Sequence, residues 1–244
     1  MNAVPRTLRA LFFDVDDTLF DTTSFALQAR DKAVEAMRAR GLRASRAETI
    51  ATMNDVVAEF GSNDDRHFDR LLMRLPRLAT EGCNRDLLVM AAVIAYHDTK
   101  WQQLRIRPEA EQLLRDLSQT ELRLGIISAG LTRKQMEKIL RLGLDQFTDH
   151  RLLFITDQVG IAKRNPLIYR RAVEAAGVEP AEAMHVGDHA AHDIEPAAAA
   201  GLRTVWHHGT GKHADTPPKI KPDHEIRDFL ELRGILREHY GVPV

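Results

Sequence analysis

Residues 8–19 read LRALFFDVDDTL, and this stretch indicates both the first strand of the fold and a candidate site. Its apolar residues run without interruption from Ala10 to Phe13 and stop abruptly at Asp14. A compact apolar run that ends in acidic residues is typical of a fully buried strand in a parallel sheet. Because ligands bind at the carboxyl ends of such strands, this acidic cluster marks the first candidate functional site.

After residue 121 the sequence alternates between helices and short apolar strands. Repeated βα units indicate a parallel sheet with helices on both faces. We therefore predict an α/β fold with a Rossmann-like parallel sheet. The further strands are expected at residues 122–128, 152–156, 183–188 and 203–207, and the helices at residues 109–118, 132–142, 166–176, 194–200 and 226–239.

Residues 22–100 have a different hydrophobic pattern, with apolar residues at helical spacing and no strand-like alternation. The helix breaks predicted from composition are Gly41, residues 61–63, Pro76 and Gly82. This stretch separates the first strand from the next by far more than one βαβ unit needs. We therefore predict a core made of residues 1–20 and 101–244, and an inserted all-helical domain at residues 21–100.

Composition narrows the class of protein. The formal net charge is −1 and no basic face or tail stands out, so neither nucleic acid nor a membrane surface is an expected partner. The apolar run near the N-terminus is far too short for a signal-peptide core or a membrane span. Cys83 is the only cysteine, which excludes an internal disulfide and indicates a cytoplasmic protein.

Charged or hydroxyl side chains follow nearly every predicted strand. The carboxyl ends of parallel strands lie at one edge of the sheet, so these side chains are expected to converge there. In chain order the candidates are Asp14 and Asp16 after the first strand, Ser128 at the end of the second, Lys163 after the third, and Asp188 and Asp193 after the fourth.

These residue types suit phosphoryl transfer. A carboxylate such as Asp14 can attack phosphorus and form an aspartyl phosphate, which divides one difficult displacement into two. A second carboxylate, Asp16, can protonate the leaving oxygen and later activate water. Asp14 and Asp188 offer the oxygen ligands that Mg²⁺ prefers, and the ion would offset repulsion between carboxylate and phosphate. Lys163 and Ser128 would hold the oxygens on which charge develops.

Four segments carry a resemblance to a known family: FFDVDDTL at residues 12–19, IISAG at 126–130, AKRNP at 162–166 and GDHAAHD at 187–193. In order, spacing and strand context they resemble the four signature motifs of the haloacid dehalogenase-like hydrolase superfamily, and together they are highly specific. The inserted helices resemble the cap of its subfamily I. The chain is also similar to a poorly characterised branch of hydrolases first noted in archaea, through GSN at 61–63, HFD at 67–69, AYH at 95–97 and KILRL at 138–142.

The resemblance implies a role for each matching residue. Asp14 would be the nucleophile and a metal ligand, and Asp16 the general acid and base, with its backbone carbonyl facing the metal. Asp188 would bind Mg²⁺ directly, while Asp193 would support the metal shell. The residues implied to contact the phosphoryl group are Thr18, Ser128, Ala129 and Lys163. The departures from the usual motifs, which are expected to alter hydrogen bonds around the site, are Ala129, Arg164 and His192.

The implied reaction is Mg²⁺-dependent hydrolysis of a small phosphorylated metabolite, with Tyr96, His97 and Lys100 of the cap as candidate substrate contacts. The alternatives are a 2-haloacid dehalogenase, a phosphonate-cleaving enzyme, a phosphomutase, and a binding or regulatory module that keeps the fold with little turnover. A dehalogenase needs no metal and gains nothing from Asp16. A phosphonate-cleaving enzyme would need a Schiff-base lysine in the cap, for which Lys32 and Lys100 are the candidates.

The remaining histidines and tryptophans do not predict a separate site. His207, His208 and His213 lie close together in sequence, but no paired cysteine or fixed ligand spacing accompanies them. They are therefore interpreted as solvated loop residues. Trp101 and Trp206 are interpreted as packing residues.

Overall fold

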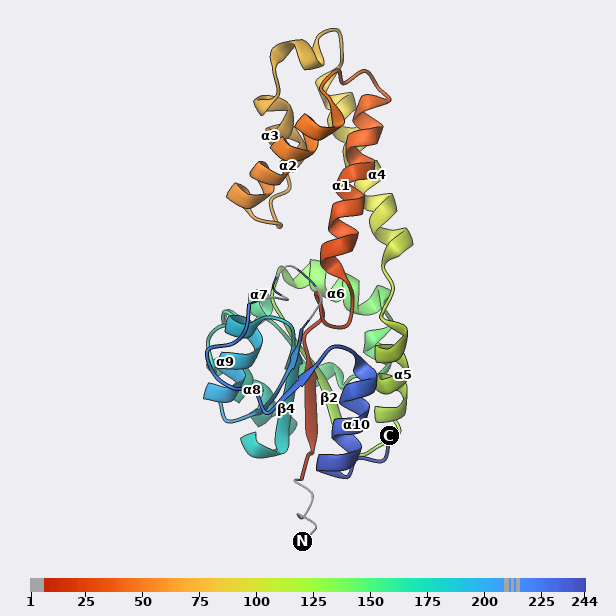
Figure 1. Cartoon of the computed structure of the whole chain (residues 1–244). Coiled ribbons are helices and arrows are strands. Elements are labelled where there is room, and N and C mark those ends of the chain that lie inside the picture. Colours follow the sequence, from red (N-terminus) through yellow and green to blue (C-terminus); the bar gives the residue numbers. More distant parts are fainter. Residues whose placement is uncertain (1–6, 209–210, 212, 214–215) are drawn as a thin grey trace. The chain divides into compact units, whose positions relative to one another are not determined.

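The computed structural model of the chain describes residues 7–208, 211, 213 and 216–244. It divides into two compact units (Figure 1). The first consists of Met1–Thr22 together with Arg105–Val244, and the second of Thr23–Leu104. The chain therefore leaves the first unit after Thr22 and returns to it at Arg105.

The first unit contains a six-stranded parallel sheet with the strand order β3-β2-β1-β4-β5-β6. β1 lies inside the sheet, with Phe12 opposite Gly125 of β2 on one side and His185 of β4 on the other. This sheet confirms the predicted α/β fold. The strands are β1 (Ala10–Phe13), β2 (Arg123–Ser128), β3 (Leu153–Ile155), β4 (Ala183–Gly187), β5 (Arg203–His207) and β6 (His224–Ile226).

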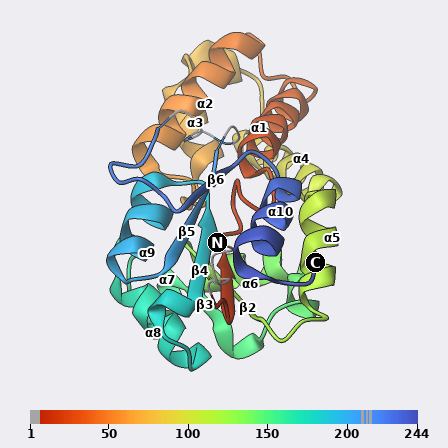
Figure 2. The same cartoon turned by 60° about the horizontal axis from the view of Figure 1, so that its bottom comes forward.

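Helices cover both faces of this sheet (Figure 2). They are α5 (Pro108–Leu117), α6 (Thr132–Arg141), α7 (Thr156–Val159), α8 (Leu167–Ala176), α9 (Glu195–Ala199) and α10 (Phe229–Tyr240). Successive side chains of a strand point to opposite faces. Accordingly, Phe12 of β1 packs in a buried cluster with Tyr169 and Val173 of α8, whereas Phe13 packs against Phe229 of α10 at a ring-centroid distance of 6.4 Å. Both faces of β1 are therefore covered, which explains why its apolar run has no polar interruption.

Two short elements depart from the sequence prediction. β6 occupies the start of the predicted final helix, and α10 begins only at Phe229, because Asp228 accepts two backbone hydrogen bonds from the first helical turn. The prediction of a helix from residue 226 is therefore wrong at this end, since a three-residue edge strand is too short to show a periodic pattern. The single turn α7 directly follows β3, where no helix is predicted.

The second unit is helical, and none of its residues, all of which are described, forms a strand. Ser45 caps its second helix by accepting a hydrogen bond from the backbone N–H of Glu48, and Gly61, with φ of 75°, ends that helix. Met53, Leu71 and other buried apolar side chains form a core within the unit. Its helices are α1 (Thr22–Arg38), which begins in the first unit, α2 (Arg46–Phe60), α3 (His67–Arg74) and α4 (Arg85–Gln103).

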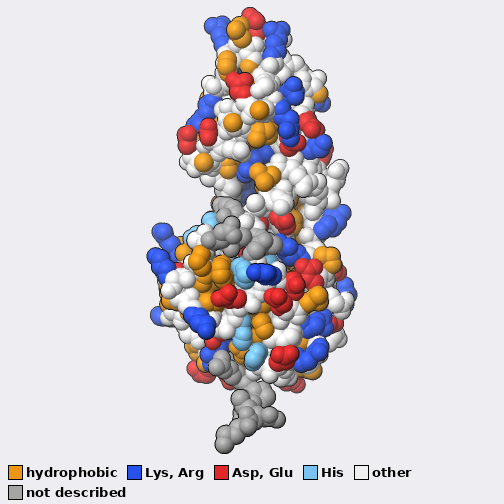
Figure 3. Space-filling view, viewed as in Figure 1, with side chains coloured by type: hydrophobic (Ala, Val, Ile, Leu, Met, Phe, Trp, Pro, Cys, Tyr) orange, Lys and Arg blue, Asp and Glu red, His pale blue; other side chains and the backbone are white. Residues whose placement is uncertain are grey.

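Charged side chains of both signs are interspersed over the face seen in Figure 3, as the net charge of −1 leads one to expect. In the part of the chain that the structure describes, no helix has both the length and the apolar composition needed to cross a membrane.

Candidate active site

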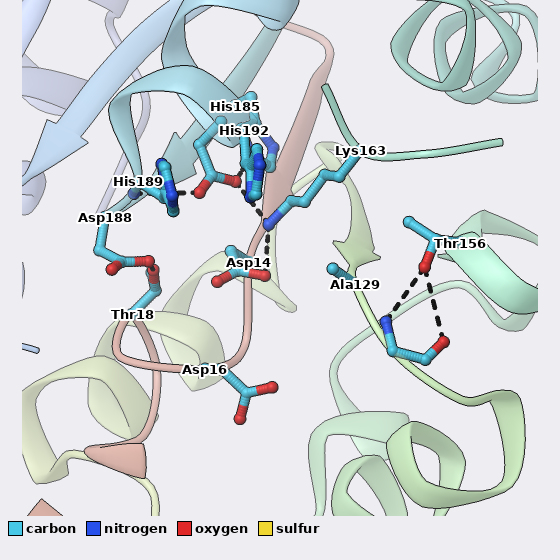
Figure 4. A network of polar contacts seen from close by, with 12 residues as sticks. Asp14, Asp16, Thr18, Ala129, Thr156, Lys163, His185, Asp188, His189 and His192 are labelled. Carbon is cyan, nitrogen blue, oxygen red and sulfur yellow. Dashed lines mark hydrogen bonds and ion pairs between the residues drawn. The ribbon is translucent and has the colours of Figure 1, made fainter. Parts of the chain in front are cut away.

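The structure brings the predicted core residues to one edge of the sheet (Figure 4). β1, β2 and β4 are neighbours, and Asp14, Ser128 and Asp188 stand at or directly after their carboxyl ends. Lys163 reaches the same edge from the loop between α7 and α8. Asp193 lies in the turn after β4, with an oxygen 2.5 Å from Nζ of Lys163. All five side chains are buried.

A tight turn after β1 sets the directions of its acidic side chains. The backbone N–H of Asp14 donates to the carbonyl of Val186 on β4 at 2.9 Å, which ties the nucleophile candidate to the neighbouring strand. Asp17 has φ of 59°, a left-handed conformation that aspartate and asparagine tolerate better than most residues. The Asp14 carboxylate faces Lys163, whereas the Asp16 carboxylate points away from both (Figure 4).

Lys163 is a buried cation held between two carboxylates. Its Nζ lies 2.5 Å from an oxygen of Asp14 and 2.5 Å from an oxygen of Asp193. Burial alone would lower the pKa of Lys163, but the charges of the two aspartates raise that pKa above its usual value. The side chain therefore stays protonated at neutral pH and can pair with a bound phosphoryl group.

Asp193 is fixed by donors from three directions. Its Oδ1 accepts from Lys163 and from Nε2 of His185 at 2.7 Å, and its Oδ2 accepts from the backbone N–H of His189 at 3.1 Å. Burial would raise the pKa of Asp193, but Lys163 and the hydrogen bond from His185 hold it well below its usual value. A Cβ on Gly187 would lie 2.3 Å from Cγ of Asp193, so only glycine fits at the end of β4.

Asp193 is carried by a π turn, Ala190–Ile194, directly after β4. Such wide helical turns often occur at functional sites, because the extra residue in the turn redirects one side chain. Here the turn directs Asp193 inward, where it is 1% exposed. The hydroxyl of Tyr169 on α8 donates to the carbonyl of His192 at 2.5 Å, which holds the turn from outside.

Asp14, Asp188 and Asp193 form a carboxylate cluster in which each residue offers an oxygen within 4.8 Å of the others. Burial raises the pKa of Asp14 to about 7 against the opposing charge of Lys163. Burial, with the charge of Asp193, raises the pKa of Asp188 to about 9. Asp188 makes no ion pair with any described residue, and the hydroxyl of Thr18 donates to it at 3.5 Å. Buried oxygen ligands in this arrangement fit Mg²⁺, and a cation would offset the repulsion among them.

Replacing Lys163 with methionine should destabilise the protein when unfolding is measured in the presence of chelator. The change leaves Asp14 and Asp193 buried without their counter-charge, and breaking a buried ion pair in this way costs about 3–5 kcal/mol. We expect the free energy of unfolding in urea to fall by about that amount. The control Lys134→Met, at an exposed position of α6, should change it by less than about 0.5 kcal/mol. Equal stabilities for the two variants would contradict the buried ion pairs.

The residues predicted to contact a phosphoryl group differ in their present contacts. Ser128 is fully buried, and its hydroxyl has no hydrogen-bond partner among the described residues. Thr18 is also fully buried and donates to Asp188. The carbonyl of Ala129 accepts from the side chain of Gln135 at 2.9 Å. A buried polar group without a partner lowers the stability of the folded protein. The Ser128 hydroxyl is therefore well suited to donate a hydrogen bond to a phosphate oxygen.

Sequence reasoning missed the residues that support the site from α6 and α7. Gln135 and Lys138 of α6 both contact the carboxylate of Asp16. Thr156 and Asp157 of α7 accept hydrogen bonds from the loop that joins β2 to α6 and from the first residue of α6. The three-residue spacing of Gln135 and Lys138 places them on one helix face, which is the one signal in the sequence that points to a shared contact.

The histidines near the C-terminus are not all solvated. His207, at the end of β5, is 1% exposed. The interpretation of His207 as a solvated loop residue is therefore wrong, because β5 carries the ring into the core. Burial lowers the pKa of His207 to about 4, so the ring is neutral at neutral pH. His208 stacks on Trp206 and His213 packs on His189, with ring-centroid distances of 4.8 and 4.0 Å.

The three candidate substrate contacts of the second unit lie on α4 and differ in exposure. Tyr96 is half-buried and packs against Phe25 and Phe68, with ring-centroid distances of 6.4 and 6.1 Å. His97 is exposed, whereas Lys100 is half-buried with its Nζ 4.4 Å from the neighbouring tryptophan ring. Tyr96 thus contributes to the packing of this unit.

Comparison with known proteins agrees with the motifs. A family model described as haloacid dehalogenase-like hydrolase matches residues 8–201. A protein named glyceraldehyde 3-phosphate phosphatase from Methanopyrus kandleri is 40% identical over 237 residues, which cover 95% of this chain and 98% of that protein. A protein of the same name from Pyrococcus furiosus is 38% identical over 238 residues, which cover 97% of this chain and 96% of that one.

Solved structures show the same fold. A HAD phosphatase from Thermococcus onnurineus superposes with a TM-score of 0.65 at 24% identity, covering 96% of this chain and 100% of that one. A putative beta-phosphoglucomutase from Thermotoga maritima gives a TM-score of 0.69 at 18% identity, covering 95% of this chain and 99% of that one. At these identities the likeness concerns the fold alone.

Proposed function

Because the chain belongs to the haloacid dehalogenase-like hydrolases, we propose that glyceraldehyde 3-phosphate is its substrate and Mg²⁺ its cofactor. The chain is a hydrolase of a small phosphate monoester, and the names of its archaeal relatives support the choice of this triose phosphate. The observation that carries the proposal is the buried Asp14 carboxylate facing Lys163, next to the strand that ends in the unpaired Ser128 hydroxyl.

In the proposed reaction, an oxygen of Asp14 attacks phosphorus while the bond from phosphorus to the ester oxygen breaks. The leaving oxygen takes a proton from Asp16, so the first half of the cycle yields a free alcohol and an aspartyl phosphate on Asp14. Asp16, now ionised, removes a proton from a water molecule that attacks the same phosphorus. The bond between phosphorus and Asp14 then breaks, inorganic phosphate leaves, and Asp16 is protonated again.

Lys163 and Ser128 stabilise the phosphoryl oxygens in this scheme, and Thr18 and the backbone at Ala129 complete their surroundings. These groups are buried, and charge interactions in a buried site are stronger than in water. Hydrolysis of phosphate monoesters without a catalyst is so slow that enzymes accelerate it by up to ~10²¹-fold. A crowded set of charges is consistent with that requirement.

The residues that would hold Mg²⁺ are Asp14, Asp188 and the backbone carbonyl of Asp16, with Asp193 supporting the shell. When bound, the ion neutralises charge that develops on the phosphoryl oxygens. Asp193 already accepts hydrogen bonds from Lys163, His185 and a backbone N–H. We therefore infer that its part is to orient the neighbouring groups, or to reach the ion through water.

The rival reactions find less support in the arrangement of the site. A 2-haloacid dehalogenase has no use for a second carboxylate two residues after the nucleophile, and no use for a cluster that fits Mg²⁺. A Schiff-base lysine needs a lowered pKa. Lys32, one of two candidates for that role, is exposed, and its hydrogen bond to Glu35 raises its pKa. No specific observation favours a phosphomutase or a regulatory module.

We place the protein in the cytoplasm. Cys83 is the only cysteine, so the chain cannot form an internal disulfide, and such chains are typical of reducing compartments.

The function is tested with a panel of phosphate esters assayed with Mg²⁺ by release of inorganic phosphate. Glyceraldehyde 3-phosphate should give the highest kcat/KM, ahead of isomeric triose phosphates, hexose phosphates and an aryl phosphate. The Asp14→Asn protein serves as the blank for contaminating phosphatase. A different ester with a kcat/KM at least about tenfold higher would overturn the choice of substrate but not the reaction.

The same panel tests the predicted substrate contacts of the second unit. His97→Ala and Lys100→Met should change kcat/KM unequally among the esters, because they would contact the part of the substrate that varies. Ser128→Ala should lower kcat/KM by a similar factor for all esters, mostly through kcat, since every substrate carries the same phosphoryl group. A uniform loss from the His97 and Lys100 variants would mean that these residues only support the helical unit.

A further inference from the structure

The carboxylate of Asp16 is held by α6 in a way that the reaction scheme does not use. Nζ of Lys138 lies 2.6 Å from Oδ1 and 2.7 Å from Oδ2 of Asp16. Nε2 of Gln135 donates to Oδ2 at 3.0 Å, and the hydroxyl of Thr22 donates to Oδ1 at 2.6 Å. Both carboxylate oxygens of the candidate acid and base are therefore fixed by side chains.

Two of these donors, Gln135 and Lys138, lie on α6, and the third, Thr22, is the first residue of α1. α6 begins at Thr132, whose backbone N–H and hydroxyl both donate to Asp157, at 2.9 and 2.6 Å. Gln135 is 4% exposed and also donates to the carbonyl of Ala129, so it ties Asp16 to the loop after β2. The side chain of Lys138 is 13% exposed, and a pair shielded to this degree holds its geometry better than a surface ion pair does.

We propose that Lys138 is a positioning residue for Asp16, and that it sets the direction of this carboxylate together with Gln135. This inference rests on the proposed function, in which Asp16 exchanges protons with the leaving oxygen and with water. Such an exchange requires the carboxyl group within hydrogen-bond reach of a defined atom. A side chain with free rotation spends little time there, so its direction is part of its efficiency.

Lys138 acts through Asp16, and this distinguishes it from a residue that contacts the substrate. Lys163 is the cation that faces Asp14 and Asp193, whereas Lys138 is bound to a carboxylate that points away from that pair (Figure 4). Loss of a contact that binds the substrate and the transition state equally would raise KM for all esters with kcat unchanged. Loss of a positioning contact should instead lower kcat, and should do so most for esters with poor leaving groups, which depend on protonation by Asp16.

The test is a double-mutant cycle of Lys138→Met with Asp16→Asn, assayed with Mg²⁺ on glyceraldehyde 3-phosphate and on an aryl phosphate. Lys138→Met alone should lower kcat for the triose phosphate by about tenfold to a hundredfold, less than the full contribution of about 10²–10⁴ from an acid–base group. KM should stay within about threefold. The loss with the aryl phosphate, which has the better leaving group, should be smaller.

In the Asp16→Asn background, Lys138→Met should lower kcat by less than about threefold, because the partner of Lys138 is already lost. Lys138→Arg keeps the charge and should recover part of the activity. The matched control is Lys134→Met on the same helix, which should leave kcat unchanged. Thermal unfolding of each variant separates loss of activity from loss of fold.

Three results would overturn the inference: an equal loss from Lys138→Met in both backgrounds, a rise in KM with unchanged kcat, or a kcat that is unchanged or raised. In each case Asp16→Asn alone must still lower kcat. If Asp16→Asn itself had no effect, the failure would instead lie in the proposed role of Asp16.

Discussion

Asp14→Asn should lower kcat by about 10³-fold or more, as the loss of a nucleophile does in other enzymes that react through a covalent intermediate. An amide oxygen is a poor nucleophile, and no other carboxylate in the described cluster faces Lys163 from the end of β1. The variant should still fold. The substitution removes one of the buried like charges, and Lys163 keeps Asp193 as its partner.

The covalent intermediate gives this prediction a second readout. Wild-type protein quenched in acid during turnover should carry a phosphoryl group that mass spectrometry locates on the peptide containing Asp14. The Asp14→Asn protein should carry none.

Asp17→Asn is the matched control, because asparagine also tolerates the left-handed conformation at this position. Asp17→Asn should lower kcat much less than Asp14→Asn does, since Asp17 takes part in no chemical step. If Asp17→Asn lowered kcat more than Asp14→Asn, the roles assigned to residues 14–18 would be wrong.

The sheet could be predicted from the sequence because its strands are buried on both faces. A run such as Ala10–Phe13 needs apolar residues at every position, and the structure buries all four. The same reasoning fails for β6, where His224–Ile226 is an edge strand with only one fully buried residue. It fails also for α7, because one helical turn is too short to display a helical period.

The site residues at strand ends were the ones most directly predictable from the sequence. Asp14, Ser128 and Asp188 follow apolar strands, so their convergence is a consequence of parallel topology. Lys138 and Gln135 lie in the middle of an amphipathic helix, 122 and 119 residues from Asp16. Their spacing places them on one helix face, but it does not identify the residue that they contact. Long-range side-chain contacts of this kind depend on the packing of whole elements, which periodicity does not encode.

His185 and His207 illustrate the same limit inside strands. Both side chains are almost fully buried, although histidine has only an intermediate tendency to be buried. His185 is retained in the core by its hydrogen bond to Asp193. Burial lowers the pKa values of both rings. Neither role can be read from neighbours in sequence, because the partners come from other elements.

Removal of Mg²⁺ should abolish turnover, and its return should restore it. Without a divalent cation, Asp14, Asp188 and Asp193 stand within 4.8 Å of one another, and a phosphate dianion would add charge to that cluster. The raised pKa values of Asp14 and Asp188, about 7 and about 9, reflect burial together with this crowding. A bound cation favours the ionised carboxylates, and Asp14 must be ionised to attack phosphorus.

The metal also has a readout that does not depend on activity. A ligand that binds only the folded protein stabilises it by RT ln(1 + [L]/Kd), which is about 2.7 kcal/mol at a hundredfold excess over Kd. Mg²⁺ without substrate should therefore raise the Tm of the wild-type protein. Asp188→Asn should lose most of that rise, because it removes a direct ligand. Asp223→Asn should retain the rise, because Asp223 binds Arg203 and Thr204 at the amino end of β5, opposite the carboxyl ends that carry the cluster. Full turnover in excess chelator, with no Mg²⁺-dependent change in Tm, would exclude the metal from the reaction.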